Sequence, residues 1–584
     1  MYHIRVALLV AFLMSGLLAA CGGGSGGSGS APLATTTYTV GGTVSGLMSG
    51  SQVTLLDNGD RGNALLVGGD GGFQFSSGLA SGSTYAVTVG AQPIGETCSV
   101  NSGSGTISAN VGGVSVTCST TTYTVGGNVA ALPSGGSVVL KNNGADPLTA
   151  TATGAFTFSN AVANGAGYSV TTYAPGESCT VTNGSGTASA NVTNVSVSCA
   201  AGTESVLWGF GGTGDGASPY AGLVMDSAGN LYGTTSSGGA HLSGTVFKLT
   251  PGSGGTYSES VLWSFGGTGD GTSPYAGLVM DSAGNLYGTT YSGGAHNSGT
   301  VFKIMPEGGG TYTESVLWSF GGTGDGKNPE AGLIMDSAGN LYGTTSSGGA
   351  HLYGTVFKLT PGSGGPYTES VLWSFGGTGD GTSPYAGLVM DSAGNLYGTT
   401  VGGGAYLSGT VFKLTPGSGG TYSESVLWSF GGTTGDGQDP YAGLVMDSSG
   451  NLYGTTYYGD ANSTGTVFKL TPGSGGTYSE SVLWSFGAGG TGDGQHPYAG
   501  LVMDSSGNLY GTTFHGGANT SGAVFKLTPG SGGTYTESVL WSFGGTTGDG
   551  QHPYAGLVMD SAGNLYGTTY SGSANGSGAV FKLN

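Results

Sequence analysis

The chain carries little charge. Charged residues make up 7% of its 584 residues, with 11 Lys and Arg against 31 Asp and Glu, so the formal net charge is −20. An acidic surface of this kind repels phosphate backbones, which disfavours nucleic acid as a partner. The chain is also too poor in charge, and with 37% hydrophobic residues too apolar, for solvated disorder.

The sequence lacks both the glycine period of collagen and the hydrophobic period of amphipathic helices. Glycine contributes 127 residues, but the glycines do not recur at every third position, which excludes a collagen helix. No segment shows a convincing helical period, which argues against repeats built from pairs of helices. Short segments rich in Tyr, Phe, Val and Leu alternate instead with glycine-rich turns, and this pattern predicts an all-β protein.

Compact catalytic and metal-binding motifs are also missing. The sequence contains no nucleophile elbow, no HExxH and no P-loop. Histidines in the loops are candidates for acid–base chemistry, but none has a partner at a motif spacing: His241, His296, His351, His496, His515 and His552. The sequence therefore favours a protein with no catalytic residue, metal or cofactor, although it leaves enzymatic activity open.

A long apolar run occurs only at the N-terminus, at residues 6–18. The run is too short for an ordinary transmembrane span and predicts a cleaved signal instead. Leu18-Ala19-Ala20-Cys21 resembles a bacterial lipobox, which implies cleavage before Cys21 and lipidation of its thiol. A plain secretory signal with Cys21 as a bystander is the alternative.

This interpretation divides the N-terminal region into a lipoprotein signal peptide (1–20) and a lipidated cysteine with a flexible Gly/Ser tether (21–35). Gly22, rather than an Asp, after the cysteine favours the outer membrane of a Gram-negative cell. We expect an exported monomer that is otherwise soluble and is held at the cell surface by its lipid alone.

Two similar modules follow, at 36–119 and 120–200. TYTVGGTVSGL at 37–47 returns as TYTVGGNVAAL at 122–132, and alternating segments bounded by Gly and Asn predict a small β-sandwich in each module. Four of the five cysteines fall two per module with a spacing of 20, which predicts one disulfide in each: Cys98 with Cys118, and Cys179 with Cys199. A metal site is the weaker alternative, because C-x-x-C spacing and nearby histidines are both absent.

The third region, 201–584, repeats one pattern seven times. Its tryptophans recur every 55 to 57 residues: Trp208, Trp263, Trp318, Trp373, Trp428, Trp484 and Trp541. A fixed period of this size is typical of solenoids and propellers. Four strand-like segments occur in each repeat, in the first at 221–226, 230–235, 245–250 and 259–265, and four antiparallel strands make one propeller blade.

The two ends of the third region complement each other. It begins with a lone ESVLWGF at 204–210 and ends after AVFKLN at 579–584, so the last repeat lacks its fourth strand. An open solenoid would need polar capping repeats at both ends. We therefore predict a closed seven-bladed β-propeller in which 204–210 is the outer strand of the last blade.

The recurring phrases ESVLWSFGGTGDG, AGLVMDSAGNLYGTT and GTVFKLTPGSGGTYSES resemble the GloVer tandem repeat, of the choice-of-anchor class of bacterial surface proteins. The resemblance covers about 204–584, and every repeat carries every part of it. It implies an exported protein anchored at the cell surface, and it implies no particular activity.

One face of the repeats varies while the other is nearly uniform. The DSAGN and PGSGG turns hardly change, whereas the loops between the second and third strands, such as SSGGAHLS and FHGGANTS, differ in Tyr, His, Phe and Asn. Varied aromatic and polar groups on a constant scaffold suit recognition of sugars. Drift after duplication is the alternative. The candidate ligand-binding residues are Tyr291, Tyr457, Tyr458, Phe514, His515 and Tyr570.

An aspartate in each GDG turn forms a further series: Asp215, Asp270, Asp325, Asp380, Asp436, Asp493 and Asp549. An Asp in a glycine-rich turn most often accepts backbone N–H bonds, and we expect that role here. Ca²⁺ coordination stays open, although one Asp per loop is a poor cage for a hard cation. The tryptophans are expected to pack between the repeats.

Three functions remain. The preferred one is a surface scaffold for binding or adhesion, with a carbohydrate or cell-wall ligand and with the membrane contacted only through the lipid. The others are an extracellular polysaccharide lyase or hydrolase that uses the varied face, and a passive structural protein of the envelope.

Overall fold

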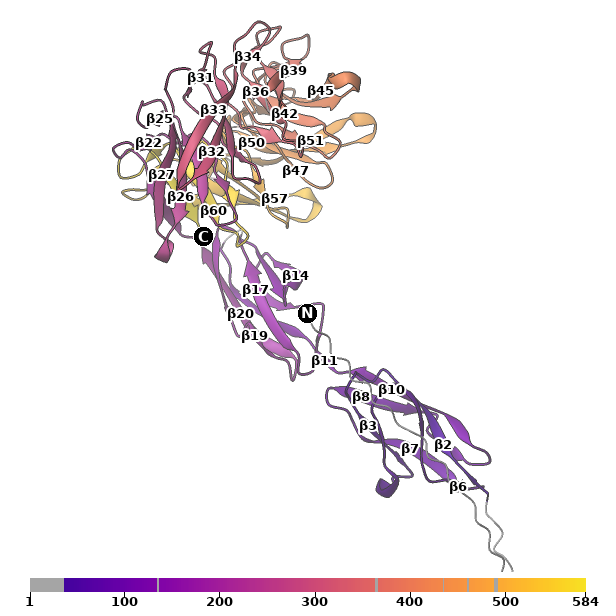
Figure 1. Cartoon of the computed structure of the whole chain (residues 1–584). Helices are drawn as coiled ribbons and strands as arrows, with labels where there is room; N and C mark the ends of the chain where they lie inside the picture. Colours follow the sequence, from indigo (N-terminus) through magenta and orange to yellow (C-terminus); the bar gives the residue numbers. More distant parts are fainter. Residues whose placement is uncertain (1–35, 134–135, 363–365, 434, 460–461, 488–491) are drawn as a thin grey trace, which may run out of the picture. The chain divides into compact units, whose positions relative to one another are not determined.

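The computed structural model describes residues 36–584 except 134–135, 363–365, 434, 460–461 and 488–491. The predicted signal peptide, Cys21 and the tether at 21–35 lie outside the described residues. Contacts divide the chain into two compact units, Met1–Thr122 and Tyr123–Asn584. The fold is all-β, as predicted, with short strands in many small sheets (Figure 1). Among the described residues, no helix has the length and apolar character to cross a membrane.

The first unit holds two four-stranded sheets. The order in one sheet is β5 (Gly71–Gln74), β2 (Val40–Ser45), β10 (Val111–Thr120) and β8 (Glu96–Asn101), and in the other β4 (Leu65–Val67), β3 (Val53–Asp57), β7 (Thr84–Ala91) and β9 (Ser104–Thr106). Strands β2 and β10 are parallel. Buried side chains from both sheets, among them Val44, Leu55 and Phe75, form one core.

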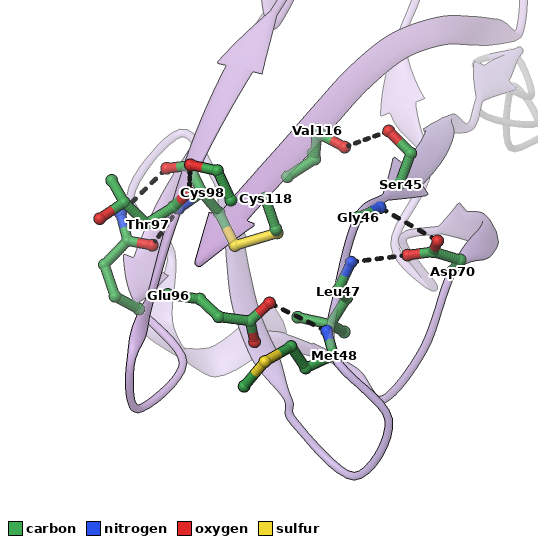
Figure 2. The surroundings of a disulfide bond; sticks show 12 residues. Ser45, Gly46, Leu47, Met48, Asp70, Glu96, Thr97, Cys98, Val116 and Cys118 are labelled. Atoms are coloured by element: carbon green, nitrogen blue, oxygen red, sulfur yellow. Dashed lines mark hydrogen bonds between the residues drawn. A yellow bond between two sulfur atoms is a disulfide. The ribbon is translucent and has the colours of Figure 1, made fainter. Parts of the chain in front are cut away.

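A disulfide fastens one edge of this unit. Cys98 on β8 lies directly opposite Cys118 on β10, and the two sulfurs are bonded (Figure 2). Beside them, Glu96 accepts a hydrogen bond from the Met48 backbone N–H, and Asp70 accepts from those of Gly46 and Leu47. The predicted disulfide is therefore confirmed, and the nearby carboxylates hold the loop that follows β2.

The start of the second unit repeats this arrangement. One sheet has the order β15 (Gly154–Thr157), β12 (Val125–Ala131), β20 (Val192–Ala201), β18 (Glu177–Thr182), and the other β14 (Ala145–Ala150), β13 (Val138–Asn142), β17 (Gly167–Tyr173), β19 (Ser185–Thr187). The disulfide Cys179–Cys199 again joins opposite residues, as predicted. The internal duplication read from the sequence is thus present in the strand order.

Each main repeat forms one four-stranded antiparallel sheet and one short ribbon. In the first repeat the sheet has the order β23 (Val224–Met225), β24 (Leu231–Thr235), β26 (Thr245–Pro251), β27 (Tyr257–Ser264). The ribbon, β22 (Gly216–Ala217) with β25 (Ser237–Gly238), was not predicted. It brings together the loop before the first strand and the loop between the second and third strands.

The strand that opens the repeat region completes the last sheet. β21 (Glu204–Gly209) pairs antiparallel with β62 (Ala579–Leu583), which continues to β60 (Leu565–Thr569) and β59 (Val558–Met559). The predicted pairing of 204–210 with the last repeat is therefore present. Without it, β62 would present a free sheet edge.

The last sheet of the repeat region packs against the first. Phe210, Tyr566 and Val580 of the last sheet pack with Leu231 and Phe247 of the first. The same contacts link each sheet to the next in the chain. The glycine of each Ala-Gly pair also lies close to the equivalent glycine of the preceding repeat. A Cβ added to Gly277 would lie 3.3 Å from the carbonyl oxygen of Gly222, and one added to Gly222 would lie 3.4 Å from that of Gly556 in the last repeat.

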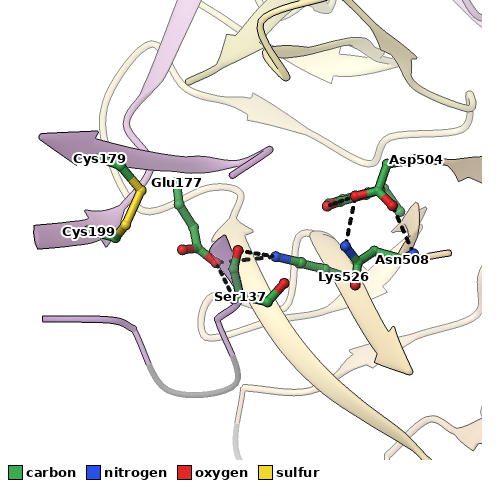
Figure 3. A network of polar contacts seen from close by, with 8 residues as sticks. Ser137, Glu177, Cys179, Cys199, Asp504, Asn508 and Lys526 are labelled. Carbon is green, nitrogen blue, oxygen red and sulfur yellow. Dashed lines mark hydrogen bonds and ion pairs between the residues drawn. A yellow bond between two sulfur atoms is a disulfide. The ribbon is translucent and has the colours of Figure 1, made fainter. Parts of the chain in front are cut away.

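Within the second unit, the disulfide-bonded module contacts the sixth repeat through an ion pair. Lys526 on β56 (Ala523–Pro529) is fully buried, and its Nζ lies 3.3 Å from Glu177 Oε1 and 3.3 Å from the carbonyl oxygen of Ser137 (Figure 3). Burial raises the pKa of Glu177, and Lys526 counteracts this. The six equivalent lysines also lie over a tyrosine ring but remain partly exposed: Lys248, Lys303, Lys358, Lys413, Lys469 and Lys582.

Lys526→Ala is expected to lower the free energy of unfolding by about 3–5 kcal/mol, because it leaves the Glu177 carboxylate buried without a cation. Lys469→Ala is the matched control. It removes the same residue from the same strand position one repeat earlier, where no module covers it, and costs about 1 kcal/mol through lost packing. Calorimetry of both variants checks this, and equal losses would show that the buried pair does not hold the module.

Candidate binding face

A ring of tyrosines lies where the repeats converge. Six repeats carry Pro-Tyr-Ala-Gly before their first strand, and the third carries Pro-Glu-Ala-Gly. These seven side chains line one cavity of about 190 Å³: Tyr220, Tyr275, Glu330, Tyr385, Tyr441, Tyr498 and Tyr554. This set was not predicted from the sequence, although the single Tyr-to-Glu change among the seven copies is a visible signal.

The six predicted ligand-binding residues all join this ring through aromatic contacts. Four of them lie on the side of the last repeats. Phe514 lies 4.4 Å from Tyr554 between ring centroids and 4.4 Å from His515. Tyr457 lies 5.9 Å from Tyr498 and 4.6 Å from Tyr458.

The other two lie on the side of the first repeats. Tyr291 is 5.4 Å from Tyr275, and Tyr570 is 5.7 Å from Tyr220. Tyr220 in turn contacts Tyr275 at 5.1 Å and Tyr554 at 4.2 Å, again between ring centroids. Side chains far apart in the sequence are therefore connected as one aromatic face, which only the meeting of first and last repeats allows.

Three histidines gather on this face. The ring centroids of His496 and His515 are 5.9 Å apart, and those of His515 and His552 are 5.6 Å apart. Burial, with the two neighbouring histidines, lowers the pKa of His515, and burial lowers that of His552. Both rings are therefore neutral near pH 7 and can donate and accept hydrogen bonds there. The other candidate histidines, at 241, 296 and 351, lie in exposed loops.

A polar cavity of about 1030 Å³ opens beside these histidines. Its lining includes Asp493, Gln495, His515, Ser521 and His552. The cavity is large enough for a short oligosaccharide. Among the described residues, the one cluster with metal-ligand spacing is Glu177 with Cys179 and Cys199, and its cysteines are closed in a disulfide.

The GDG aspartates have the structural role that we expected. Asp215 Oδ2 accepts a hydrogen bond from Trp208 Nε1 at 3.2 Å, and its Oδ1 accepts one from the Gly216 N–H at 2.7 Å. The same tryptophan–aspartate bond recurs in the next three repeats. The tryptophans of these four repeats are thus partly buried and tied to their own loops.

The sheets and the binding face define an all-β repeat protein in which aromatic and polar side chains lie side by side on one surface. The chain belongs to the Gloeobacter/Verrucomicrobia repeat family, which matches residues 166–390, 310–492 and 476–584. The resemblance seen in the sequence is therefore confirmed. No curated protein matches the chain.

Three solved structures are similar in part. The extracellular domain of a hybrid two-component system protein from B. thetaiotaomicron is 12% identical, with a TM-score of 0.42, over 65% of this chain and 39% of that one. An ancestral GH74 enzyme is 10% identical, with a TM-score of 0.42, over 74% and 55%. A protein described as a 6-phosphogluconolactonase from Bacteroides uniformis is 13% identical, with a TM-score of 0.37, over 69% and 95%. The chain spans less than two thirds of the first two, and likenesses this distant carry no functional argument.

Proposed function

We propose that residues 201–584 form a closed seven-bladed β-propeller that serves as an exported binding scaffold. The pairing of β21 with β62 supports closure, as does the packing of the last sheet on the first. The two disulfides support export, because such bonds persist in oxidising compartments. The two duplicated modules at 36–119 and 120–200 stand in the sequence between the proposed anchor and the propeller.

Attachment is proposed to occur through a lipid on Cys21 at the outer membrane, because Leu18-Ala19-Ala20-Cys21 resembles a lipobox. Wild-type protein expressed in bacteria is expected to incorporate labelled palmitate, and Cys21→Ser is expected to incorporate none. Mass spectrometry of the mature N-terminus provides a second readout. An unlabelled wild-type chain cleaved elsewhere would reject the anchor.

The ligand is proposed to be an oligosaccharide of a cell wall or surface glycan. The observation that carries this proposal is the continuous aromatic network beside the polar cavity of about 1030 Å³. Tyrosine and phenylalanine rings stack on the apolar faces of sugars, while the amide, hydroxyl and imidazole groups hydrogen-bond to sugar hydroxyls. Each contact is weak, so display of many copies would raise the effective affinity.

Combined Tyr458→Ala and His515→Ala substitution is expected to weaken glycan binding about tenfold or more, since each lost aromatic contact is worth about 0.5–1.5 kcal/mol. Glycan arrays followed by titration of the mature, lipid-free chain measure this. Tyr353→Ala with Tyr406→Ala is the control, because these exposed tyrosines occupy the equivalent loops of other repeats. Equal binding by all variants would show that the face consists of drifted loops, and release of sugar products would identify an enzyme instead.

A further inference from the structure

One position breaks the symmetry of the tyrosine ring. Glu330 occupies the place that tyrosine holds in the other six repeats. It directly precedes the Ala-Gly pair that leads into β35 (Ile334–Met335). It is the one carboxylate among the residues that line the central cavity. A charged side chain at a position that is otherwise aromatic changes what the cavity can bind.

Glu330 also closes a second cavity next to the ring. This cavity has a volume of about 330 Å³, and its lining is Tyr220, Ser236, Tyr275, Tyr291, Glu330 and Tyr570. The four tyrosines form a continuous wall, because each ring contacts the next with centroid separations of 5.1–5.7 Å. The volume lies near the lower end of small-ligand sites, which begin at about 300 Å³.

The carboxylate of Glu330 has no cationic partner among the described residues. Its hydrogen bond there comes from Ser346 Oγ, which lies 3.2 Å from Oε1 and also donates to the carbonyl oxygen of Asn328. The salt bridge found in the described parts of the chain is that of Lys526 with Glu177, in another repeat. A partly buried carboxylate beside four aromatic rings therefore lacks the positive charge that would balance it.

We propose that the cavity formed by Tyr220, Tyr275, Tyr291, Tyr570 and Glu330 binds an organic ammonium group. The faces of aromatic rings attract cations, and several rings around one point select bulky ammonium groups that carry apolar substituents. The carboxylate supplies the opposite charge. A divalent metal fits less well, because it requires several oxygen ligands and finds a single carboxylate.

This site is separate from the proposed glycan site. The glycan cavity is lined by residues of the sixth and seventh repeats, whereas the ammonium cavity takes its residues from the first, second, third and seventh. The two cavities share no lining residue, so substitution of Glu330 changes the ammonium cavity and not the glycan cavity, and the Glu330 variants distinguish the two sites.

The acid–base state of the cavity supports the assignment. Burial raises the pKa of Glu330 to about 7, and the hydrogen bond from Ser346 counteracts this in part. The titratable groups that line the two cavities with it are the hydroxyls of Tyr220, Tyr275, Tyr291, Tyr385, Tyr441, Tyr498, Tyr554 and Tyr570. Burial raises the pKa of Tyr220, Tyr275, Tyr385, Tyr441 and Tyr498. Glu330 alone therefore changes charge near neutrality, and binding of a cation is expected to strengthen as pH rises through about 7.

The experiment titrates the mature chain with two ammonium probes, choline and glucosamine, by calorimetry at about pH 8. Their neutral counterparts are dimethylbutanol, which replaces the choline nitrogen by carbon, and N-acetylglucosamine. We expect binding of at least one ammonium probe and about tenfold weaker binding of its neutral counterpart. Preference between the two probes distinguishes a quaternary ammonium from an amino sugar.

Glu330→Gln is expected to weaken binding of the bound probe about tenfold and to remove its dependence on pH. Glu330→Tyr, which restores the residue of the other six repeats, tests the same point with a side chain that the ring already accommodates. Glu307→Gln, at an exposed carboxylate of the second repeat, is the control. Melting temperatures verify that each variant is folded. Absence of binding by both probes, equal binding of neutral counterparts, or unchanged binding by Glu330→Gln would overturn the proposal.

Discussion

Replacing residues 204–210 by a Gly/Ser segment of equal length is expected to lower the melting temperature of the repeat region by about 10 °C or more and to promote aggregation. The replacement removes β21 from the last sheet and leaves the edge of β62 without a partner. It also removes Phe210, which is fully buried and lies 4.9 Å from Phe247 of the first repeat between ring centroids. Both the last sheet and its junction with the first lose support.

Equal length matters because residues 204–210 also connect the second module to the repeats. Addition of a peptide with the sequence ESVLWGF is expected to restore part of the lost stability, whereas a scrambled peptide is not. Calorimetry and light scattering measure both effects. An unchanged melting curve, or equal rescue by the scrambled peptide, would favour an open array of sheets over the proposed propeller.

The strand order of the repeats could be predicted because the information is local. Short segments rich in β-branched and aromatic residues, such as TVFKLT at 245–250, mark the strands, and glycine-rich turns bound them. The pairing of 204–210 with the last repeat followed from counting which strands lacked a partner. Disulfides followed in the same way from equal spacing in two similar modules.

The ribbon β22–β25 could not be predicted in this way. Each of its strands has two residues, mostly glycine and serine, and so carries no periodic pattern. Its pairing depends on loops from both ends of a repeat meeting on one side of the sheet. Local propensity gives no signal at this scale.

The sequence also could not predict that equivalent residues of different repeats differ in burial. Lys526 and its six counterparts have nearly the same sequence surroundings, and contact with the module that contains Glu177 buries Lys526. The site residues show the reverse: residues far apart in the sequence come together in the structure. Tyr291 and Tyr570 are variable loop residues in the sequence, and the structure brings both to the same cavity with Glu330.

A series of half-buried glutamates gives the repeats an unusual dependence on pH. One occurs near the start of each outer strand: Glu204, Glu259, Glu314, Glu369, Glu424, Glu480 and Glu537. In each, Oε1 is buried without a hydrogen-bond partner. Glu259, for example, lies directly opposite the fully buried Leu249 in the sheet.

Burial is the main cause that raises the pKa of these carboxyls, and a nearby GDG aspartate adds to it. The pKa of Glu259 rises to about 7, with Asp215 as the second cause, and that of Glu537 rises to about 8. The folded state therefore keeps protons that the unfolded chain has lost above its ordinary glutamate pKa of about 4.3. Stability is then present at low pH and falls as pH rises from about 4.5 through 7.

A second series of groups limits stability on the acid side. In the hairpin turns, burial acts to raise the pKa of Asp226, but hydrogen bonds from Asn230, Tyr232 and Ala228 outweigh it and lower the pKa. Four equivalent aspartates behave in the same way: Asp281, Asp336, Asp391 and Asp447. Their contribution is lost as pH falls below about 4. The repeat region is therefore expected to be most stable near pH 5.

The melting temperature is accordingly expected to fall steadily between about pH 5 and pH 9, with several protons released on unfolding near pH 6. Each glutamate contributes at most about 1.4 kcal/mol per pH unit, and partial exposure to water reduces this. Glu259→Gln is expected to remove about one seventh of the slope, and Glu307→Gln, at an exposed site, none of it. Calorimetry in buffers of different ionisation enthalpy counts the protons directly. A flat profile, or equal slopes for the two variants, would show that water or a counter-ion reaches these carboxylates in the folded protein and balances their charge.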